Sequence, residues 1–375
     1  MDELEYHRCP QARSGPPGIV KALPAEWFVP HGTNAEMRWD TLPGAGPDTP
    51  VERFFVRNHT STPLIDPDGW RLRVFGSGLR GPAVEFGLAE LRRLPETALS
   101  AVIECAGNGR RFYATQQRQA VPGTPWELGG IGAARWRGVR LAEVLRRAGI
   151  VPGAVDVLPV GLDPEYLGED GTNYGHVRRP LPVAKAMDDV LLAYEMNGGP
   201  LLPDHGAPVR LVVPGWAGIA SIKWVGSLEV STEPLHSPWD TDFYRLFGPA
   251  HPPGGSAPLT CQVVKSAFEL ARGAVLEPGR RHRLYGRSWS GRAAVRQVRV
   301  STDGGVLWHR AHLWDDPHPG TWTRWSFDWR PERPGPYELR ARATDDLGGT
   351  QPDTAEFNRE GYLFGAVVGH PVRVG

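Results

Sequence analysis

Apolar and polar residues follow two kinds of spacing in the first 230 residues. The segment WRLRVF at 70–75 alternates, which predicts a strand, and the mostly apolar run ALSAVIEC at 98–105 predicts a buried strand that leads into the glycine turn AGNG. LAEVLRRA at 141–148 has apolar residues at helical spacing and precedes Gly149, which predicts a helix that ends there. Further short elements are predicted as helices at 88–94 and 183–187 and strands at 191–194 and 209–213. This mixture favours an α+β domain over a regular βαβ array.

The pattern changes after about residue 230. Prolines and glycines are frequent between residues 233 and 258, which indicates a linker or a wrapping loop. Beyond it, strands are predicted at 282–289, 295–301, 306–313, 322–329 and 337–344. The Asp-Gly pair of STDGG at 301–305 lies between two of them and predicts a hairpin. Strands at this spacing predict an all-β sandwich of roughly 100 residues.

Length and charge narrow the function classes. A chain of 375 residues is expected to form two domains. Its 42 basic and 42 acidic residues balance, which argues against a general nucleic-acid or membrane-surface partner, so anion binding has to come from local clusters of positive charge. No apolar run is long enough to span a membrane. The N-terminal MDELEYHRCPQARSG lacks a signal peptide, so we expect a cytoplasmic location, or a periplasmic one if a leader has been removed.

The cysteines are few and far apart. Cys9, Cys105 and Cys261 form no CxxC pair, which argues against a zinc, iron–sulfur or attached-haem site. Cys105 precedes a glycine turn followed by Arg110 and Arg111, and nearby cations favour the thiolate form of a cysteine. The segment ECAGNGRR therefore suits either a cysteine nucleophile or a soft metal ligand, and the residues alone leave both open.

Arginines and histidines in apolar or glycine-rich contexts are the second chemical signal. Guanidinium groups bind oxyanions well because two N–H donors meet two oxygens. Several such groups in one pocket would bind a sulfate-like or phosphate-like ligand. Two histidines lie in predicted turns without the HExxH spacing of a zinc hydrolase. The residues concerned are Arg57, Arg135, Arg178, Arg179, Arg210, His59 and His205.

Several motifs resemble the sulfite oxidase family, in its haem-free bacterial form. They are FFVRNH at 54–59, ECAGNGRR at 104–111, IGAARWRGVRL at 131–141, YG at 174–175, WSG with STDGG within 289–305, and the block 182–226 that begins PVAKAMDD and ends KWVG. The resemblance implies an α+β molybdopterin-binding domain of the sulfite oxidase type, followed by an all-β immunoglobulin-like sandwich that forms a homodimer. We place a wrapping segment at 1–50, the catalytic domain at 51–235, a linker at 236–258 and the sandwich at 259–375.

The resemblance also implies the site residues. Cys105 would bind the molybdenum of a pyranopterin-dithiolene cofactor, and a soft thiolate suits that metal. The residues implied to bind the pterin and its phosphate are Arg57, Asn58, His59, Asp163, His205, Arg210, Ser221 and Lys223. Those implied to act on the substrate are Tyr174, Arg110, Arg57, Arg292 and Trp126.

Two stretches depart from the family pattern. CAGNGRR carries a glycine where many members read CAGNRR, and YGHVRRPLP brings in His176, Arg178 and Arg179, whose role the sequence does not assign. The cofactor assignment is unaffected, but the substrate pocket differs.

The implied function is oxidation of sulfite, or of a related sulfur oxyanion, to sulfate by oxygen-atom transfer. No haem domain precedes the core, so we expect electrons to pass to an external acceptor, either oxygen or a cytochrome c-like carrier. Alternatives are a nitrate or other oxyanion reductase, a sulfane-sulfur dehydrogenase subunit, a cysteine-nucleophile hydrolase or transferase, and a binding module without turnover.

Overall fold

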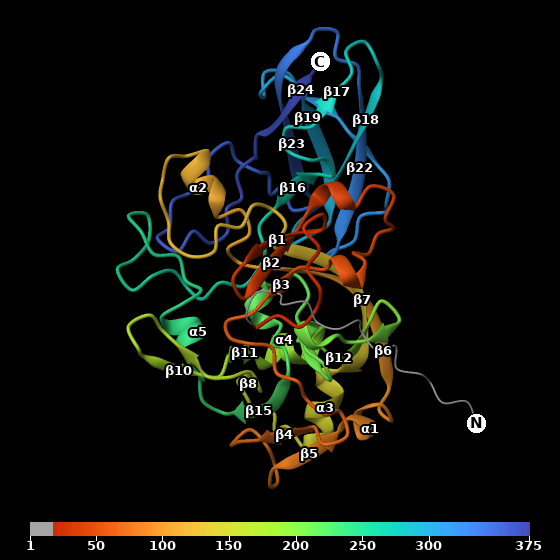
Figure 1. Cartoon of the computed structure of the whole chain (residues 1–375). Helices are drawn as coiled ribbons and strands as arrows, with labels where there is room; N and C mark the ends of the chain where they lie inside the picture. The colour runs from red at the N-terminus through yellow and green to blue at the C-terminus, as the bar shows by residue number, and fades with distance from the viewer. Residues whose placement is uncertain (1–17) are drawn as a thin grey trace, which may run out of the picture.

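The computed structural model describes residues 18–375 (Figure 1). The N-terminal stretch searched for a signal peptide, Cys9 and the first part of the predicted wrapping segment lie outside these residues. In the described part of the chain, no helix has the length and apolar character needed to cross a bilayer.

The N-terminal segment forms a small antiparallel sheet over the catalytic domain. The hairpin β1 (Phe28–His31) and β2 (Asn34–Met37) pairs with β3 (Val56–Arg57). The 3-10 turns η1 (Trp39–Thr41) and η2 (Val51–Arg53) connect them. Asn34 lies opposite Arg57 in this sheet, so the hairpin fixes the backbone of the predicted FFVRNH motif.

Two five-stranded sheets and short helices form the catalytic domain, which confirms the α+β prediction. One sheet has the order β11 (Leu181–Pro182), β8 (Asp156–Gly161), β15 (Val225–Ser231), β4 (Arg71–Phe75) and β5 (Val84–Gly87). The other contains β13 (Gly199–Pro200), β12 (Leu191–Met196), β7 (Ile131–Arg140) and β6 (Glu96–Glu104), with β14 (Arg210–Val212) also paired to β12. The remaining elements are α1 (Leu88–Leu91), α2 (Arg111–Thr115), α3 (Leu141–Ala148), β9 (Tyr166–Leu167), β10 (Asn173–Gly175), α4 (Val183–Asp188), η3 (Pro203–His205) and η4 (Gly218–Ala220).

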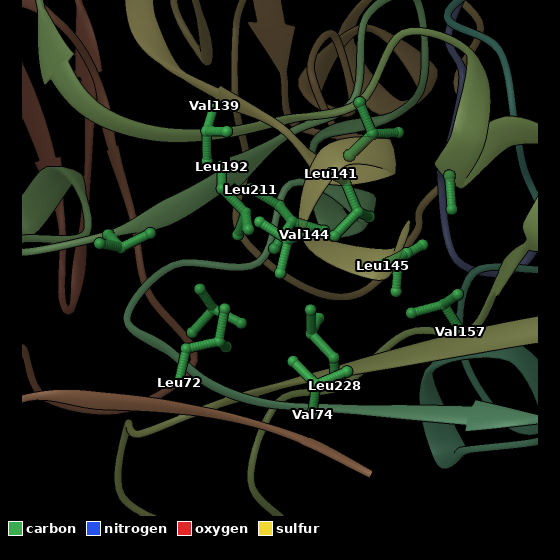
Figure 2. Close-up of a cluster of buried hydrophobic side chains, with 14 of the residues drawn as sticks. Leu72, Val74, Val139, Leu141, Val144, Leu145, Val157, Leu192, Leu211 and Leu228 are labelled. Atoms are coloured by element: carbon green, nitrogen blue, oxygen red, sulfur yellow. The ribbon is translucent and has the colours of Figure 1, made fainter. Parts of the chain in front are cut away.

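Helix α3 joins the two sheets through one apolar face. Figure 2 shows its side chains between residues of both sheets. The labelled residues are Leu141, Val144 and Leu145 of α3, Leu72, Val74, Val157 and Leu228 of one sheet, and Val139, Leu192 and Leu211 of the other. Burial of each large aliphatic side chain contributes about 1.5–3 kcal/mol. The helix ends at Gly149, whose positive φ of 85° closes the last turn as predicted.

Residues beyond 264 form two packed sheets, which confirms the predicted β-sandwich. One sheet has the order β16 (Lys265–Phe268), β18 (His282–Trp289), β22 (Trp322–Trp329) and β21 (His312–Leu313). The other is β17 (Val275–Leu276), β24 (His370–Val374), β23 (Gly335–Asp345), β19 (Val295–Ser301) and β20 (His309–Arg310). Figure 1 shows them as the blue and cyan strands at the top. The immunoglobulin type of this sandwich stays a prediction.

The predicted strand at 306–313 is wrong in one respect. The segment contains two short strands that belong to different sheets: β20 pairs with β19, whereas β21 pairs with β22. The Asp303 carboxylate accepts the backbone N–H groups of Val306 and Leu307, so the first residues extend the turn instead of the strand. The hairpin predicted from STDGG is present as the β19–β20 pair.

Candidate active site

Cys105 lies at the point where β6 ends in a tight turn. Its N–H donates to the Gly130 carbonyl at 2.9 Å, and its own carbonyl accepts the N–H of Asn108 at 2.9 Å. Gly109, the residue that departs from the family pattern, has a φ of +93°, and a Cβ placed there would lie 3.1 Å from Cβ of Phe364. Because both the backbone conformation and the available space favour glycine, this departure is a requirement of the turn. The thiol is half-buried.

The turn lies at one wall of a pocket with about 720 Å³ of empty space, part of it open to solvent. The structure brings to it Cys105 and all eight residues implied to bind the pterin. They come from β3 and the residues that follow it, from the turn after β6, from the loop after β8, from η3, from β14 and from the segment after η4. The pocket residues predicted from the sequence are Arg57, Asn58, His59, Cys105, Asp163, His205, Arg210, Ser221 and Lys223.

Buried positive charge is the dominant electrostatic feature of the pocket. Burial lowers the pKa of Arg210 to about 9, and it lowers the pKa of Lys223 well below its ordinary value. Burial also raises the pKa of Asp163 to about 6, which weakens its role as a counter-ion. The other carboxylate, Asp204, is occupied by the backbone N–H groups of residues 20 and 21 and by the hydroxyl of Thr62. An anionic ligand would supply the missing negative charge.

Several polar groups in the pocket remain open to a ligand. Nη1 of Arg57 and Nε2 of His205 are buried atoms without a hydrogen-bond partner in the described structure. Buried polar atoms of this kind are costly unless a ligand or water binds them. Together with the surplus of cations and the half-buried thiol, they fit a ligand that combines a phosphate, a polar ring system and a thiophilic metal.

His59 is held in one tautomer. The indole Nε1 of Trp239, which can only donate, lies 3.3 Å from Nε2 of His59, so this nitrogen is an acceptor. The Tyr244 hydroxyl lies 3.2 Å from the same nitrogen. Burial, and then the charges of Arg57 and Lys223, keep the pKa of His59 well below its ordinary value. The neutral ring therefore carries its proton on Nδ1.

The tyrosine of the pocket is Tyr244, which the sequence interpretation missed. It lies in PWDTDFYRLF, after the short helix α5 (Pro238–Thr241), within the segment interpreted as a linker. Its hydroxyl lies 3.5 Å from Nη2 of Arg57, and its ring stacks on Tyr362 at 5.1 Å. Burial raises the pKa of Tyr244. The aromatic residues in this proline-rich segment were the available signal, because a free linker has no reason to carry them.

Four residues implied to act on the substrate lie outside the pocket lining. Tyr174 packs on Phe243 with ring centroids 5.0 Å apart. Arg110 donates to backbone carbonyls and lies over the ring of Tyr362, one aromatic layer from Tyr244. Trp126 is buried behind Phe55, which does line the pocket. Arg292 is exposed and lines a separate cavity that also contains Cys261, so the structure does not bring it to Cys105.

The arginines of YGHVRRPLP hold the Tyr244 segment in place. Arg179 is 2% exposed and donates to the carbonyls of Trp239 and Leu259, the latter at 2.7 Å. Arg178 donates to the Tyr174 carbonyl and lies over the ring of Trp239. His176 is exposed and bonds through Nδ1 to the Asp163 carbonyl. Two of these three residues therefore fix the loop that carries Tyr244.

Replacing Arg179 by methionine is expected to destabilise the protein. The buried carbonyls of Trp239 and Leu259 would lose their donor, and each carbonyl left without one costs about 1–3 kcal/mol. Urea unfolding of the variant measures the loss. The matched control is Arg178→Met, which removes a partly exposed neighbour and is expected to cost less. Equal losses in the two variants would contradict the assigned role of Arg179.

Stability of the cofactor-free protein is expected to fall as the pH drops below about 6.5, the ordinary pKa of histidine. Burial lowers the pKa of His59, His205 and His370, so the unfolded chain gains protons there that the folded chain does not. Each such histidine contributes a slope of about 1.4 kcal/mol per pH unit. Asp163, whose pKa is raised to about 6, takes up a proton in the folded chain before it does so in the unfolded chain, and this one proton partly offsets the effect of the histidines. Urea unfolding at several pH values measures the dependence of the unfolding free energy on pH. The double variant His59→Asn and His205→Asn should show a smaller slope than the wild type. An unchanged slope in that variant would contradict this prediction.

Comparison with known proteins agrees with this geometry. A family model described as the oxidoreductase molybdopterin binding domain matches residues 59–239. The chain is 38% identical to the sulfite oxidase of Gallus gallus over 84% of this chain and 71% of that protein. It is 39% identical to the mitochondrial sulfite oxidase of Homo sapiens, of which it spans 60%, and 31% identical to a nitrate reductase of Hordeum vulgare, of which it spans 40%.

A solved structure extends the match over both domains. The crystal structure of the sulfane dehydrogenase SoxCD from Paracoccus pantotrophus matches 98% of this chain and 91% of the compared chain, with a TM-score of 0.75 and 26% identity. The pocket around Cys105, the domain match and these relatives together show that the chain belongs to the sulfite oxidase family of molybdopterin-binding oxidoreductases.

Proposed function

We propose that this protein oxidises sulfite, or a closely related sulfur oxyanion, to sulfate with a molybdenum cofactor bound at Cys105. The overall reaction adds one oxygen atom from water to sulfite and releases two protons and two electrons. Sulfite oxidases are its relatives over most of the chain, which supports this choice. The observation that carries the proposal is the pocket itself, where a half-buried thiol lies beside buried cations that lack sufficient counter-charge.

The residues of the pocket divide into two groups by the part of the cofactor that their chemistry suits. Arg210 and Lys223 lie with His205 around the part richest in buried positive charge, which suits the phosphate of the pterin. Asn58, His59, Asp163 and Ser221 supply the short polar groups for the pterin ring, with Nδ1–H of His59 as a donor. Cys105 is the proposed metal ligand. When bound, the cofactor supplies the oxygen-atom transfer and accepts the two electrons.

Arg57 and Tyr244 are the residues of this chain best placed to bind the anion. The guanidinium lies beside both the thiol of Cys105 and the hydroxyl of Tyr244, and its Nη1 has no hydrogen-bond partner among residues 18–375. It would neutralise and orient the sulfur oxyanion, and Tyr244 would donate a hydrogen bond to it. Arg110 and Trp126 would support this site from behind. The predicted substrate contacts of Tyr174 and Arg292 require movements that bring them to the pocket.

Metal analysis combined with substrate comparison tests the proposal. Purified protein is expected to contain about one molybdenum per chain together with a pterin, in keeping with a single thiolate ligand. It should reduce ferricyanide with sulfite as the donor. Absence of molybdenum in protein from molybdenum-replete cells would favour a cysteine-nucleophile enzyme. Protein that is fully loaded with molybdenum but turns over neither a sulfur oxyanion nor nitrate would favour a binding module.

A second candidate is reduction of nitrate on the same scaffold. It is favoured by the nitrate reductase relatives, which match 89% of this chain. The named activity of the sulfane dehydrogenase makes a sulfane sulfur compound a further alternative. Both alternatives would use the same cofactor contacts as sulfite oxidation and would differ only in the compound bound at the substrate site. Turnover with sulfite, with nitrate and a reduced dye, and with a sulfane sulfur donor separates the three.

The remaining assignments are also proposals. We propose that electrons leave to an external acceptor without a haem of this protein, that the sandwich forms a homodimer, and that the location is cytoplasmic. Absorption spectra of the purified protein, its mass in solution and cell fractionation test these three points separately.

A further inference from the structure

A buried carboxylate immediately precedes the proposed metal ligand. Glu104 is the last residue of β6 and is 2% exposed. Its Oε1 accepts Nζ of Lys265 at 2.7 Å and Nδ2 of Asn108 at 2.9 Å, and its Oε2 accepts Nε1 of Trp289 at 3.0 Å. All three donors are themselves buried.

Two of these donors come from the β-sandwich. Lys265 begins β16 and Trp289 ends β18, so the sandwich reaches across to the end of β6. Nζ of Lys265 also donates to the carbonyl of Asn108 at 2.7 Å, inside the Cys105 turn. The lysine therefore contacts the turn both before and after the cysteine.

The network continues on the catalytic side. Oδ1 of Asn108 accepts the N–H of Gly130, and the carbonyl of Gly130 accepts the N–H of Cys105. The backbone of residues 104–108 is thus hydrogen-bonded to β7 on one side and to the sandwich on the other. A fully satisfied buried network of this kind fixes one geometry.

Stability alone is a poor explanation for the ion pair. Burying Lys265 and Glu104 costs desolvation energy that the pair roughly recovers, and apolar residues of similar size often serve stability equally well. A gain in position is the better explanation, because these contacts fix the turn that carries Cys105 at both Glu104 and Asn108.

We infer that Glu104, Lys265 and Trp289 are positioning residues that make the β-sandwich part of the metal-ligand site. They line no part of the pocket and act through the backbone of residues 104–108. This inference rests on the proposed function, in which Cys105 binds molybdenum. It gives the second domain a role in the geometry of the thiolate.

The test compares two buried ion pairs, each with its cation on the sandwich. Lys265→Met removes the cation that contacts the Cys105 turn. The matched control is Arg287→Met: Arg287 is 0% exposed, pairs with Glu269 at 2.5 Å, and makes no hydrogen bond to residues 104–109 in the described structure. Both variants leave one buried carboxylate without its cation, so both are expected to unfold at lower temperature.

Only Lys265→Met is expected to disturb the thiolate. In molybdenum-loaded protein it should alter the visible thiolate-to-molybdenum charge-transfer absorption and lower kcat about tenfold at unchanged KM, the size of effect seen when the groups that orient a metal ligand are removed. Arg287→Met should leave the absorption and kcat unchanged when each is normalised to molybdenum content. Identical absorption and kcat in the two variants would overturn the inference.

A measurement on cofactor-free protein separates this inference from the proposed function. In cofactor-free protein, Lys265→Met should raise the alkylation rate of Cys105 several-fold, measured by peptide mass spectrometry, with Cys261 as the internal reference, while Arg287→Met leaves it unchanged. If wild-type protein binds no molybdenum, the proposed function fails, whereas the alkylation comparison still decides whether the sandwich positions the turn.

A neutral pair covers the case in which Lys265→Met does not fold. Glu104→Gln combined with Lys265→Gln removes both charges and keeps groups that can hydrogen-bond to each other. It is expected to fold and to show slower alkylation of Cys105 than Glu104→Ala combined with Lys265→Ala, which removes the hydrogen bonds as well. Equal alkylation rates in these two double variants would contradict positioning by the network.

Discussion

Replacing Cys105 by serine is expected to abolish sulfite oxidation while the pterin stays bound. The cations and polar groups proposed to hold the pterin remain, so cofactor content should change little. Loss of the thiolate removes the proposed ligand of the reacting metal. We expect kcat to fall at least about a thousandfold, since removing even one hydrogen-bond donor from a transition state costs about 10²–10³-fold. Steady-state assay with ferricyanide, normalised to molybdenum, measures the loss.

Cys261→Ser is the matched control for this experiment. Cys261 is also half-buried and free, but it lines a different cavity. Its replacement is expected to leave kcat and cofactor content unchanged. Activity in Cys105→Ser close to that of Cys261→Ser would show that the thiol of Cys105 has no part in the reaction.

Arg57→Gln is expected to lower kcat/KM for sulfite by on the order of a hundredfold, the usual cost of losing one charged donor to a reacting anion. Arg57 is the cation that lies beside both Cys105 and Tyr244, and its free Nη1 has no other partner among the described residues. Glutamine keeps a donor but removes the charge, so the anion loses its counter-ion in a buried site.

The control for this variant is Arg80→Gln, an exposed arginine outside the pocket lining. It changes net charge equally and should leave kcat/KM unaltered. Measurement at two salt concentrations separates long-range attraction of sulfite from binding at the site, because only the former is screened by salt. An Arg57→Gln variant with the kinetics of Arg80→Gln would exclude Arg57 from anion binding.

Local patterns in the sequence predicted most of the fold. The strands at 282–289, 295–301 and 322–329 have the predicted bounds, and helix α3 ends at the predicted glycine. Alternation and helical spacing are properties of residues close together in the sequence, so they can be recognised without knowledge of the tertiary structure. The segment 306–313 differs because its two halves join different sheets, and no local pattern records which sheet a strand joins.

The site was predicted unevenly for a similar reason. Seven of the eight residues predicted to bind the pterin lie in the motifs at 54–59 and 182–226, and the structure gathers these seven and Asp163 in one pocket. Tyr244 was missed because composition indicated a linker where packing on Tyr362 and His59 makes an ordered wall. Tyr174 was chosen from a motif that gives its position but not the direction of its side chain, which packs on Phe243.

Contacts between residues far apart in the sequence could not be predicted from local patterns. Glu104 looked like the polar end of an apolar strand, and its partner Lys265 lies 161 residues away. Arg292 was placed by its spacing after WSG, but its distance from Cys105 depends on how the two domains meet. Contacts between domains are set by packing of complete surfaces, which single motifs do not encode.

The central claim is a bond between the sulfur of Cys105 and molybdenum. X-ray absorption at the molybdenum edge, on wild-type protein and on Cys105→Ser at equal loading, tests it most directly. The account predicts one sulfur neighbour fewer around the metal in the variant. The same number of sulfur neighbours in both proteins would contradict it.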